Sequence, residues 1–218
     1  MFRWLATRLA VLACAVPLAL ALAAWSAPAF AQATTTGPAG RVAALSGTAL
    51  ATRPGEARPR ALAPDAPVFQ GDRIETTPGS RVKLVFADGT VVMLGEGTTL
   101  TVDWFLYAPR IDLRAMLLLV PTGIFRIVVD ALIPDSRFEV RTETAVASVR
   151  GTDWMAEAGA DATAVVVLEG RVAVGNARGE VTLGPREGTT VRRGEPPSPP
   201  SEWGQARIDA FERATAVP

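Results

Sequence analysis

The chain has 218 residues, with 22 Lys and Arg against 22 Asp and Glu, one cysteine and no histidine. Without histidine there is no Ser-His-Asp triad, no Cys-His pair, no His-ligated zinc and no imidazole that titrates near neutral pH. The even charge balance leaves no overall excess of Lys and Arg to displace counterions from phosphates, so we expect no nucleic-acid partner.

The first 31 residues have the pattern of a secretory signal peptide. Arg3 and Arg8 form a positive start, residues 9–24 are almost entirely apolar, and residues 29–31 are an A-x-A cleavage site. We predict cleavage after Ala31 and a periplasmic or secreted protein. The less favoured alternative is an uncleaved membrane anchor, because the apolar run approaches the ~20 residues that span a bilayer. Cleavage would remove Cys14, so the core, and not disulfides, must stabilise the mature protein.

Residues 32–39 read as a small polar linker, and residues 40–194 have the texture of an all-β domain. Short runs of Val, Leu, Ile, Thr and Phe are broken about every 6–12 residues by Gly, Pro or Asp-Gly. Residues 81–86 alternate apolar and charged, which predicts a strand with one buried face. Residues 137–142 repeat this pattern. Residues 116–120, 124–129 and 164–168 are apolar on both faces, which suits strands that are covered on both sides or that meet a partner.

Residues 195–218 are predicted to form a proline-rich spacer followed by a short helix. The spacer runs from Glu195 to Ser201. Ser201 is a candidate N-cap, and an apolar stripe predicts a helix from Trp203 to about Ala214. We expect this helix to pack back on the sheet, with binding to a partner as the alternative.

Two aspartates, each next to a glycine, are interpreted as turn residues. Asp72 follows Gly71, and Asp88 precedes Gly89; an Asp side chain can bond its own backbone while Gly adopts positive φ. The sequence has no calcium loop, and its Gly-rich segment at residues 95–97 lacks the lysine of a phosphate loop. We therefore assign no catalytic residue, no cofactor and no metal site.

Five apolar residues are the candidates for partner binding. Trp104, Phe105 and Tyr107 cluster before a proline; core packing is the favoured interpretation, and an exposed cluster would anchor a protein or stack on sugar rings. Val129 and Ile133 belong to the apolar stretch from residue 116 to residue 133, whose exposed part would be an interface.

The motifs together resemble the FecR domain, named for the ferric citrate regulator of Gram-negative bacteria. The resemblance covers about Arg41 to Gly194, and the R-G-T turn at residues 149–152 is its most specific piece. It is carried, in order, by residues 71–76, 82–90, 138–142, 149–152 and 167–172. It implies an extracytoplasmic all-β fold with solenoid-like or sandwich character and no enzymatic activity.

The resemblance also bears on partners and on structural residues. In membrane-bound members, the domain receives a signal from an outer-membrane receptor while a cytoplasmic segment controls a sigma factor. Here only about eight residues precede the apolar segment, too few for a sigma-binding domain, so the sequence does not support carrying direct sigma-factor control over to this chain. In the turn Arg150-Gly151-Thr152, Gly151 permits an unusual backbone conformation and Arg150 has Glu143 or Asp153 as possible partners.

Two functions remain open at this point. The first is a non-enzymatic regulatory or adaptor module that binds an envelope protein, at the outer or the inner membrane, through sheet edges or apolar strands. The second is a module that binds a cell-envelope polysaccharide such as peptidoglycan. No small-molecule substrate is indicated. Direct tight iron binding is not expected, because the mature chain offers only oxygen ligands.

Overall fold

The computed structural model describes residues 37–111, 113–130 and 136–217. These residues belong to one unit that starts at Thr35. The predicted signal peptide, most of the linker and Ile133 lie outside the described residues. Strands make up 56% of the structure, with one short helix at the C-terminal end, so the predicted all-β class is confirmed.

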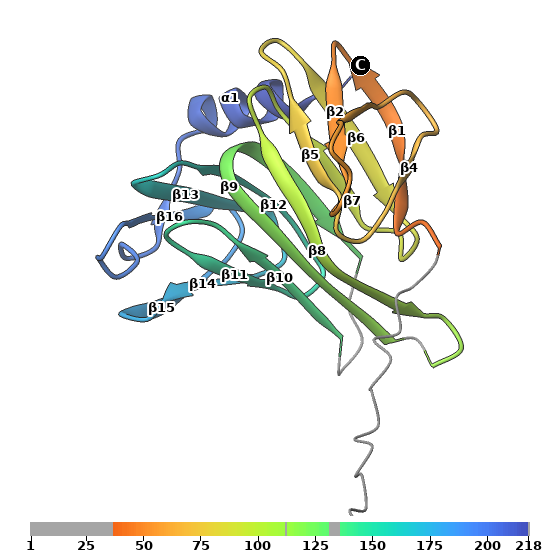
Figure 1. The fold of residues 1–218 in the computed structure, drawn as a ribbon. Coiled ribbons are helices and arrows are strands. Elements are labelled where there is room, and N and C mark those ends of the chain that lie inside the picture. Colours follow the sequence, from red (N-terminus) through yellow and green to blue (C-terminus); the bar gives the residue numbers. More distant parts are fainter. Residues whose placement is uncertain (1–36, 112, 131–135, 218) are drawn as a thin grey trace, which may run out of the picture. The chain divides into compact units, whose positions relative to one another are not determined.

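Two sheets share one long strand, β9, which spans Leu113–Val129 (Figure 1). All neighbours in the first sheet are antiparallel. The first sheet has the order β4 (Pro67–Val68), β1 (Gly40–Ser46), β6 (Arg81–Phe86), β7 (Val91–Leu94), β9, β12 (Thr152–Ala158), β13 (Ala162–Glu169), β16 (Glu187–Arg192) and β17 (Ser201–Glu202).

The second sheet is also antiparallel, except that β10 runs parallel to β9. It has the order β3 (Arg60–Ala61), β2 (Ala49–Thr52), β5 (Arg73–Thr76), β8 (Thr99–Ala108), β9, β10 (Arg137–Arg141), β11 (Val146–Val149), β14 (Val172–Asn176) and β15 (Gly179–Leu183). The buried side chains of both sheets form one continuous hydrophobic cluster, as in a β-sandwich.

Strand β9 changes sheets at Gly123. Residues before it pair with β8 and β10, whereas residues 123–129 pair with β7 and β12. Gly123 has φ +116°, and a Cβ there would lie 2.3 Å from Thr98. The Thr98 hydroxyl accepts a hydrogen bond from the Ile124 N–H and donates one to the Ile124 carbonyl, each at 3.1 Å. Glycine thus permits the bend, and Thr98 supplies the hydrogen bonds that the bend removes from the ladder.

The alternation predicted for residues 81–86 is present in β6. Val82, Leu84 and Phe86 are at most 2% exposed, and the residues between them are half-buried. The hairpin that follows is closed by Asp88, whose two carboxylate oxygens accept hydrogen bonds from the N–H and the hydroxyl of Thr90 at 3.0 and 2.8 Å. Gly89 has φ +89°, which the tight turn requires.

The C-terminal helix α1 (Gln205–Thr215) begins later than predicted, because Ser201 does not cap it. Ser201 lies in β17, where it pairs with Gly188, and the helix starts after Gly204. The expectation that the helix packs back on the sheet is confirmed. Trp203, Ile208 and Phe211 cover the outer surface of the first sheet at Met155, Val166 and their neighbours.

Strand β13 therefore has two covered faces. Val165 and Val167 point into the sandwich, whereas Val166 points outward and is buried beneath α1. This accounts for the unbroken apolar run of residues 164–168. The run of residues 116–120 in β9 differs, because Leu117 and Leu119 on its outer side are only half-buried.

Candidate functional site

The outer face of the second sheet carries a row of side chains that crosses six strands. Trp104 on β8 pairs with Leu117 on β9, and Leu117 pairs with Glu139 on β10. The row then continues through positions on β11, β14 and β15, which are Ser148, Ala173 and Thr182. Within this row the character changes from apolar at β8 and β9 to polar and small at β11, β14 and β15.

The apolar end of the row is centred on Trp104. This side chain is 54% exposed, one of two exposed large apolar side chains in the part of the chain that the structure describes; the other is Ile111. A groove of about 240 Å³ lies beside it. Its lining comes from three neighbouring strands and comprises Trp104, Ala115, Met116, Leu117, Arg137, Glu139 and Arg141. An exposed indole beside an apolar groove is typical of a protein interface.

The predicted aromatic cluster is divided between the core and the surface. Phe105 is 4% exposed, and its ring packs against that of Phe86 at 5.7 Å between centroids. Tyr107 is half-buried against the core cluster. Successive strand residues point to opposite faces, so of these three only Trp104 is an exposed side chain.

The other two candidate contacts do not add to this surface. Val129 is 4% exposed and pairs with Thr152 at the end of β9, so it is a core residue that a partner cannot reach in this conformation. Ile133 lies outside the described residues.

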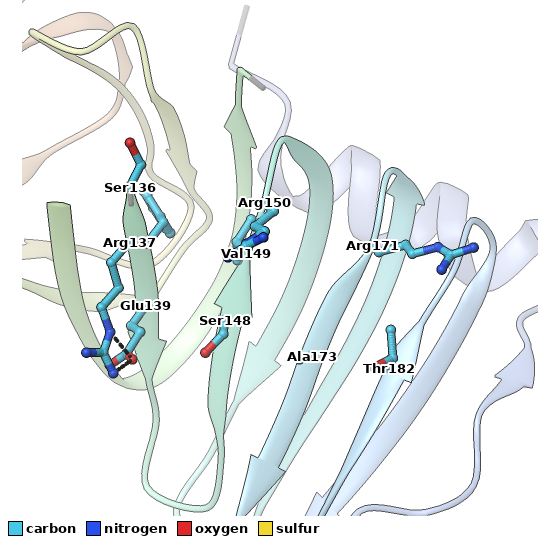
Figure 2. A pocket seen from close by; sticks show the side chains of 10 residues that line it. Ser136, Arg137, Glu139, Ser148, Val149, Arg150, Arg171, Ala173 and Thr182 are labelled. Carbon is cyan, nitrogen blue, oxygen red and sulfur yellow. Dashed lines mark hydrogen bonds and ion pairs between the residues drawn. The ribbon is translucent and has the colours of Figure 1, made fainter. Parts of the chain in front are cut away.

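The polar end of the row forms a second groove, of about 370 Å³. Figure 2 shows Arg137, Arg150 and Arg171 around it, with Ser148, Ala173 and Thr182 on its floor. The three arginines lie at the neighbouring ends of β10, β11 and β14: Arg137 precedes Phe138, Phe138 pairs with Val149, and Val149 pairs with Val172. Arg150 directly follows Val149, and Arg171 directly precedes Val172. Sequence reasoning did not find this group, since its members are distant in the chain.

The only carboxylate that lines either groove, among the described residues, is Glu139. It is 8% exposed and lies between two arginines. Arg137 donates from Nε at 2.7 Å, and Arg141 donates at 3.2 Å. Glu139 is thus already paired, whereas Arg150 and Arg171 have no acidic partner within the described part of the chain.

Part of the chain matches the model of a known protein family. Residues 72–173, from the turn before β5 to β14, match the model of the FecR protein family. The chain carries a FecR domain. The match contains β8, β9, β10 and β11, and hence Trp104, Arg137 and Arg150; Arg171 lies two residues from its end. This supports a regulatory role in signalling and supplies no catalytic residue.

The fold has a solved counterpart. Two crystal structures of a putative anti-sigma factor from Parabacteroides distasonis ATCC 8503 superpose with a TM-score of 0.53 at 24% sequence identity. The similarity covers 64% of this chain and 63% of that one, so the chain spans less than two thirds of the other protein. At this identity the likeness shows the fold. No curated protein matches the chain.

The R-G-T turn of the FecR domain packs against the turn at Gly170. Gly151 has φ +58°, and its carbonyl oxygen lies 2.4 Å from where a Cβ on Gly170 would be, so two turns touch here. Thr152 is 3% exposed and begins β12. The tight approach of these two turns requires glycine at position 170.

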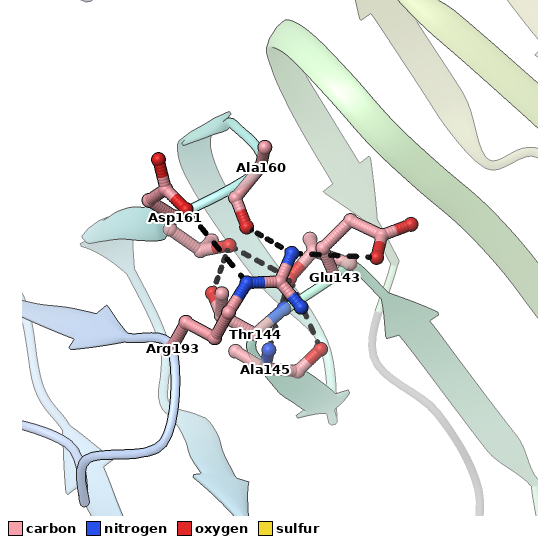
Figure 3. Close-up of polar contacts among 8 residues, drawn as sticks. Glu143, Thr144, Ala145, Ala160, Asp161 and Arg193 are labelled. Atoms are coloured by element: carbon pink, nitrogen blue, oxygen red, sulfur yellow. Dashed lines mark hydrogen bonds and ion pairs between the residues drawn. The ribbon is translucent and has the colours of Figure 1, made fainter.

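The acids proposed as partners of Arg150 are paired elsewhere, so that expectation is wrong. Asp153 accepts hydrogen bonds from Arg126 at 2.8 and 2.5 Å, and this contact raises the pKa of the Arg126 guanidinium further above its ordinary value. Glu143 pairs with Arg193 at 3.8 Å. Figure 3 shows Arg193 joining the turn before β11 to the turn before β13, where it also contacts Asp161.

Asp72, the first residue of the FecR match, does more than close a turn. Its side chain is fully buried. One carboxylate oxygen accepts the Phe69 N–H at 2.8 Å, and both oxygens bind the Arg60 guanidinium. Arg53 lies 3.7 Å away and stacks over the Phe69 ring at 3.8 Å. Gly71 has φ +86°, as the turn interpretation requires, but the two arginines were not predicted.

The described residues give no sign of metal chemistry. Among them, no three His, Cys, Asp or Glu side chains gather in a way that would hold a metal ion. Within the same residues, no helix combines the length and the apolar character that a membrane span requires.

Proposed function

We propose that this protein is a periplasmic or secreted, non-enzymatic FecR-domain protein that acts as a regulatory or adaptor module in envelope signalling. It binds another envelope protein through the outer face of its second sheet. The observation that carries the proposal is the exposure of Trp104 beside a groove formed by β8, β9 and β10. A tryptophan that is half in water on an otherwise well-packed domain is a favoured anchor for a protein partner.

The distribution of apolar surface supports this choice of face. The outer face of the first sheet is covered in part by α1, which buries Met155 and Val166. The outer face of the second sheet keeps Leu117 and Leu119 half-exposed next to Trp104. The match to a family of signalling proteins and the fold of a putative anti-sigma factor are consistent with a protein partner.

The predicted signal peptide supports export, and its removal can be measured directly. Intact mass and N-terminal sequencing of the protein from a periplasmic fraction should give a chain that begins at Gln32. A chain that keeps residues 1–31 and sediments with membranes would instead support an anchored protein.

The partner is tested by crosslinking in the periplasm. A C-terminally tagged protein is crosslinked, captured and analysed by mass spectrometry, together with Trp104→Ala and the matched variant Ile111→Ala, in which the other exposed apolar residue is removed. We expect a specific envelope protein with the wild type and with Ile111→Ala, and its loss with Trp104→Ala. Both substitutions are at the surface, so the free energy of unfolding should change by less than about 0.5 kcal/mol. Equal capture by all three proteins would refute the proposal.

A polysaccharide partner is the alternative, since Trp104 can also stack on a sugar ring. Two of the three aromatic residues that would form a stacking platform are wholly or partly buried, which makes this alternative weaker. It would be favoured if the wild type, but not Trp104→Ala, sedimented with purified peptidoglycan and if no protein were captured.

A further inference from the structure

The second groove contains more positive charge than the fold explains. Arg137, Arg150 and Arg171 all line it, and all three are exposed. The whole chain is neutral, so this concentration of like charge does not follow from composition. Like charges at neighbouring strand positions repel one another, and within the described part of the chain two of these arginines have no acidic partner to offset the repulsion.

The local balance is positive even when Glu139 is included. That carboxylate accepts hydrogen bonds from Arg137 and Arg141 on its own strand, so it is unavailable to Arg150, which follows β11, and to Arg171, which precedes β14. Among the described residues, Arg150 and Arg171 have no acidic partner, so their guanidinium groups are available at the rim. Guanidinium binds carboxylates in a planar two-bond geometry and is a common contact for acidic ligands in interfaces.

The floor of the groove suits an extended peptide. Ser148, Ala173 and Thr182 are small, and two of them offer hydroxyl groups that can exchange hydrogen bonds with a backbone. The aromatic lining that sugar rings stack on is not found there among the described residues, since Phe138 is 2% exposed and faces the core. Because Arg137 and Glu139 line both grooves, the positive groove continues directly into the groove of Trp104.

We propose that the positive groove binds an acidic, extended segment of the partner protein, and that the same segment places an apolar side chain against Trp104. This inference rests on the proposed function and names the chemistry of its partner. The segment crosses the strands of the second sheet along the row from β8 to β14.

The spacing of the strands sets the spacing of the partner's residues. Neighbouring strands are ~4.8 Å apart, so β11 lies ~14 Å and β14 ~19 Å from β8 across the row. An extended chain rises ~3.3 Å per residue. The acidic residues that meet Arg150 and Arg171 should therefore lie about four and about six positions from the apolar anchor.

Binding of short synthetic peptides tests this spacing and charge. The probes are fluorescein-labelled Leu-Ser-Thr-Ser-Glu-Ser-Glu and the same residues in reverse order, because the direction of the segment is not fixed; in the matched peptides Gln replaces Glu. Fluorescence anisotropy is measured at low salt and at physiological salt. We expect one acidic peptide to bind about tenfold or more tightly than its Gln counterpart, and its affinity to fall as salt screens the charges.

Variants of the protein assign the binding to the groove. Arg150→Gln with Arg171→Gln should weaken the acidic peptide about tenfold or more and leave the Gln peptide unchanged. The control, Arg58→Gln with Arg213→Gln, removes the same charge from exposed positions away from the groove and should have little effect. Circular dichroism confirms that each variant is folded.

Several results would overturn the inference. Equal affinity for the Glu and Gln peptides, equal weakening by the control variant, or no binding by the wild type at ~1 mM peptide would each do so. So would displacement of the peptide by tetragalacturonate at a lower concentration than unlabelled peptide requires, because a polysaccharide would then be the better ligand. If Trp104→Ala abolishes crosslinking to the envelope protein and Arg150→Gln with Arg171→Gln does not, the proposed function stands and the acidic segment is wrong.

Discussion

Replacing Asp72 with asparagine tests whether the buried ion pair at the start of the FecR domain stabilises the fold. The substitution keeps the shape of the side chain, removes its charge and turns an amide N–H₂ toward the Arg60 guanidinium, so donor faces donor. Breaking a fully buried pair by removal of one partner costs ~3–5 kcal/mol. The side chains of Arg60 and Arg53 are 29% and 37% exposed and can turn toward water, which lowers our estimate to about 2–3 kcal/mol.

The assay is urea unfolding followed by tryptophan fluorescence. A loss of this size is a large part of the ~5–15 kcal/mol that a domain has, so the midpoint should move clearly at an unchanged slope. The matched control is Asp65→Asn, which breaks the ion pair of Asp65 with Arg41, at 3.1 Å. The side chains of this pair are 85% and 56% exposed, so its loss should cost less than about 0.5 kcal/mol.

Comparing the two variants shows whether the buried carboxylate of Asp72 stabilises the fold. If Asp72→Asn were no more destabilising than Asp65→Asn, the carboxylate of Asp72 would contribute no more than an exposed one does. The assignment of a buried three-residue ion cluster would then be wrong. If the slope of the Asp72→Asn transition also fell, the loop before β5 would be opening separately from the rest of the fold.

Three further predictions concern the rest of the fold. Trp203→Ala should lower the free energy of unfolding by about 3–5 kcal/mol, because the ring is 5% exposed and packs edge-to-face on Phe211 at 5.5 Å. Urea unfolding measures this loss, and faster tryptic cleavage within α1 would show that the helix detaches. Gly123→Ala should lower the free energy of unfolding by more than ~2 kcal/mol. Gly97 also has positive φ, but a Cβ there would meet open space, so Gly97→Ala should lower it by only ~1 kcal/mol. Similar losses would contradict the close approach at the bend of β9. The free energy of unfolding should be nearly constant from about pH 6 to 9. The chain has no histidine, and the raised pKa of Arg126 means that the contribution of this arginine is lost only as pH rises above that range. A transition near about pH 6.5 would refute this.

The strands could be predicted from sequence because their signal is local. The alternation of residues 81–86 and the Asp88-Gly89 turn are contained in a few consecutive positions, and β6 and its hairpin follow them. The start of α1 was missed because a competing interaction is not local. Ser201 has the side chain of a good N-cap. In the fold, however, its backbone lies in β17 and pairs with Gly188, so the helix begins after it.

The candidate site was predicted less well, for two different reasons. Trp104 and Phe105 were grouped although adjacent strand residues point to opposite faces, so the sequence itself already excluded their joint exposure. The arginine group has no sequence signal. Arg137, Arg150 and Arg171 become neighbours only through the order of β10, β11 and β14, which short motifs do not specify.

The two outer faces of the sandwich both carry apolar side chains, but these are shielded from water to different extents. On the first sheet, the apolar residues Met155 and Val166 point away from the core and are nevertheless fully buried, because α1 covers them. On the second sheet, Leu117 and Leu119 also point away from the core but stay half-exposed beside Trp104. Exposed apolar surface is unfavourable in water, so contiguous patches are usually kept where a partner buries them. The helix fulfils that role within the chain on the first sheet, and on the second sheet we expect another protein to fulfil it.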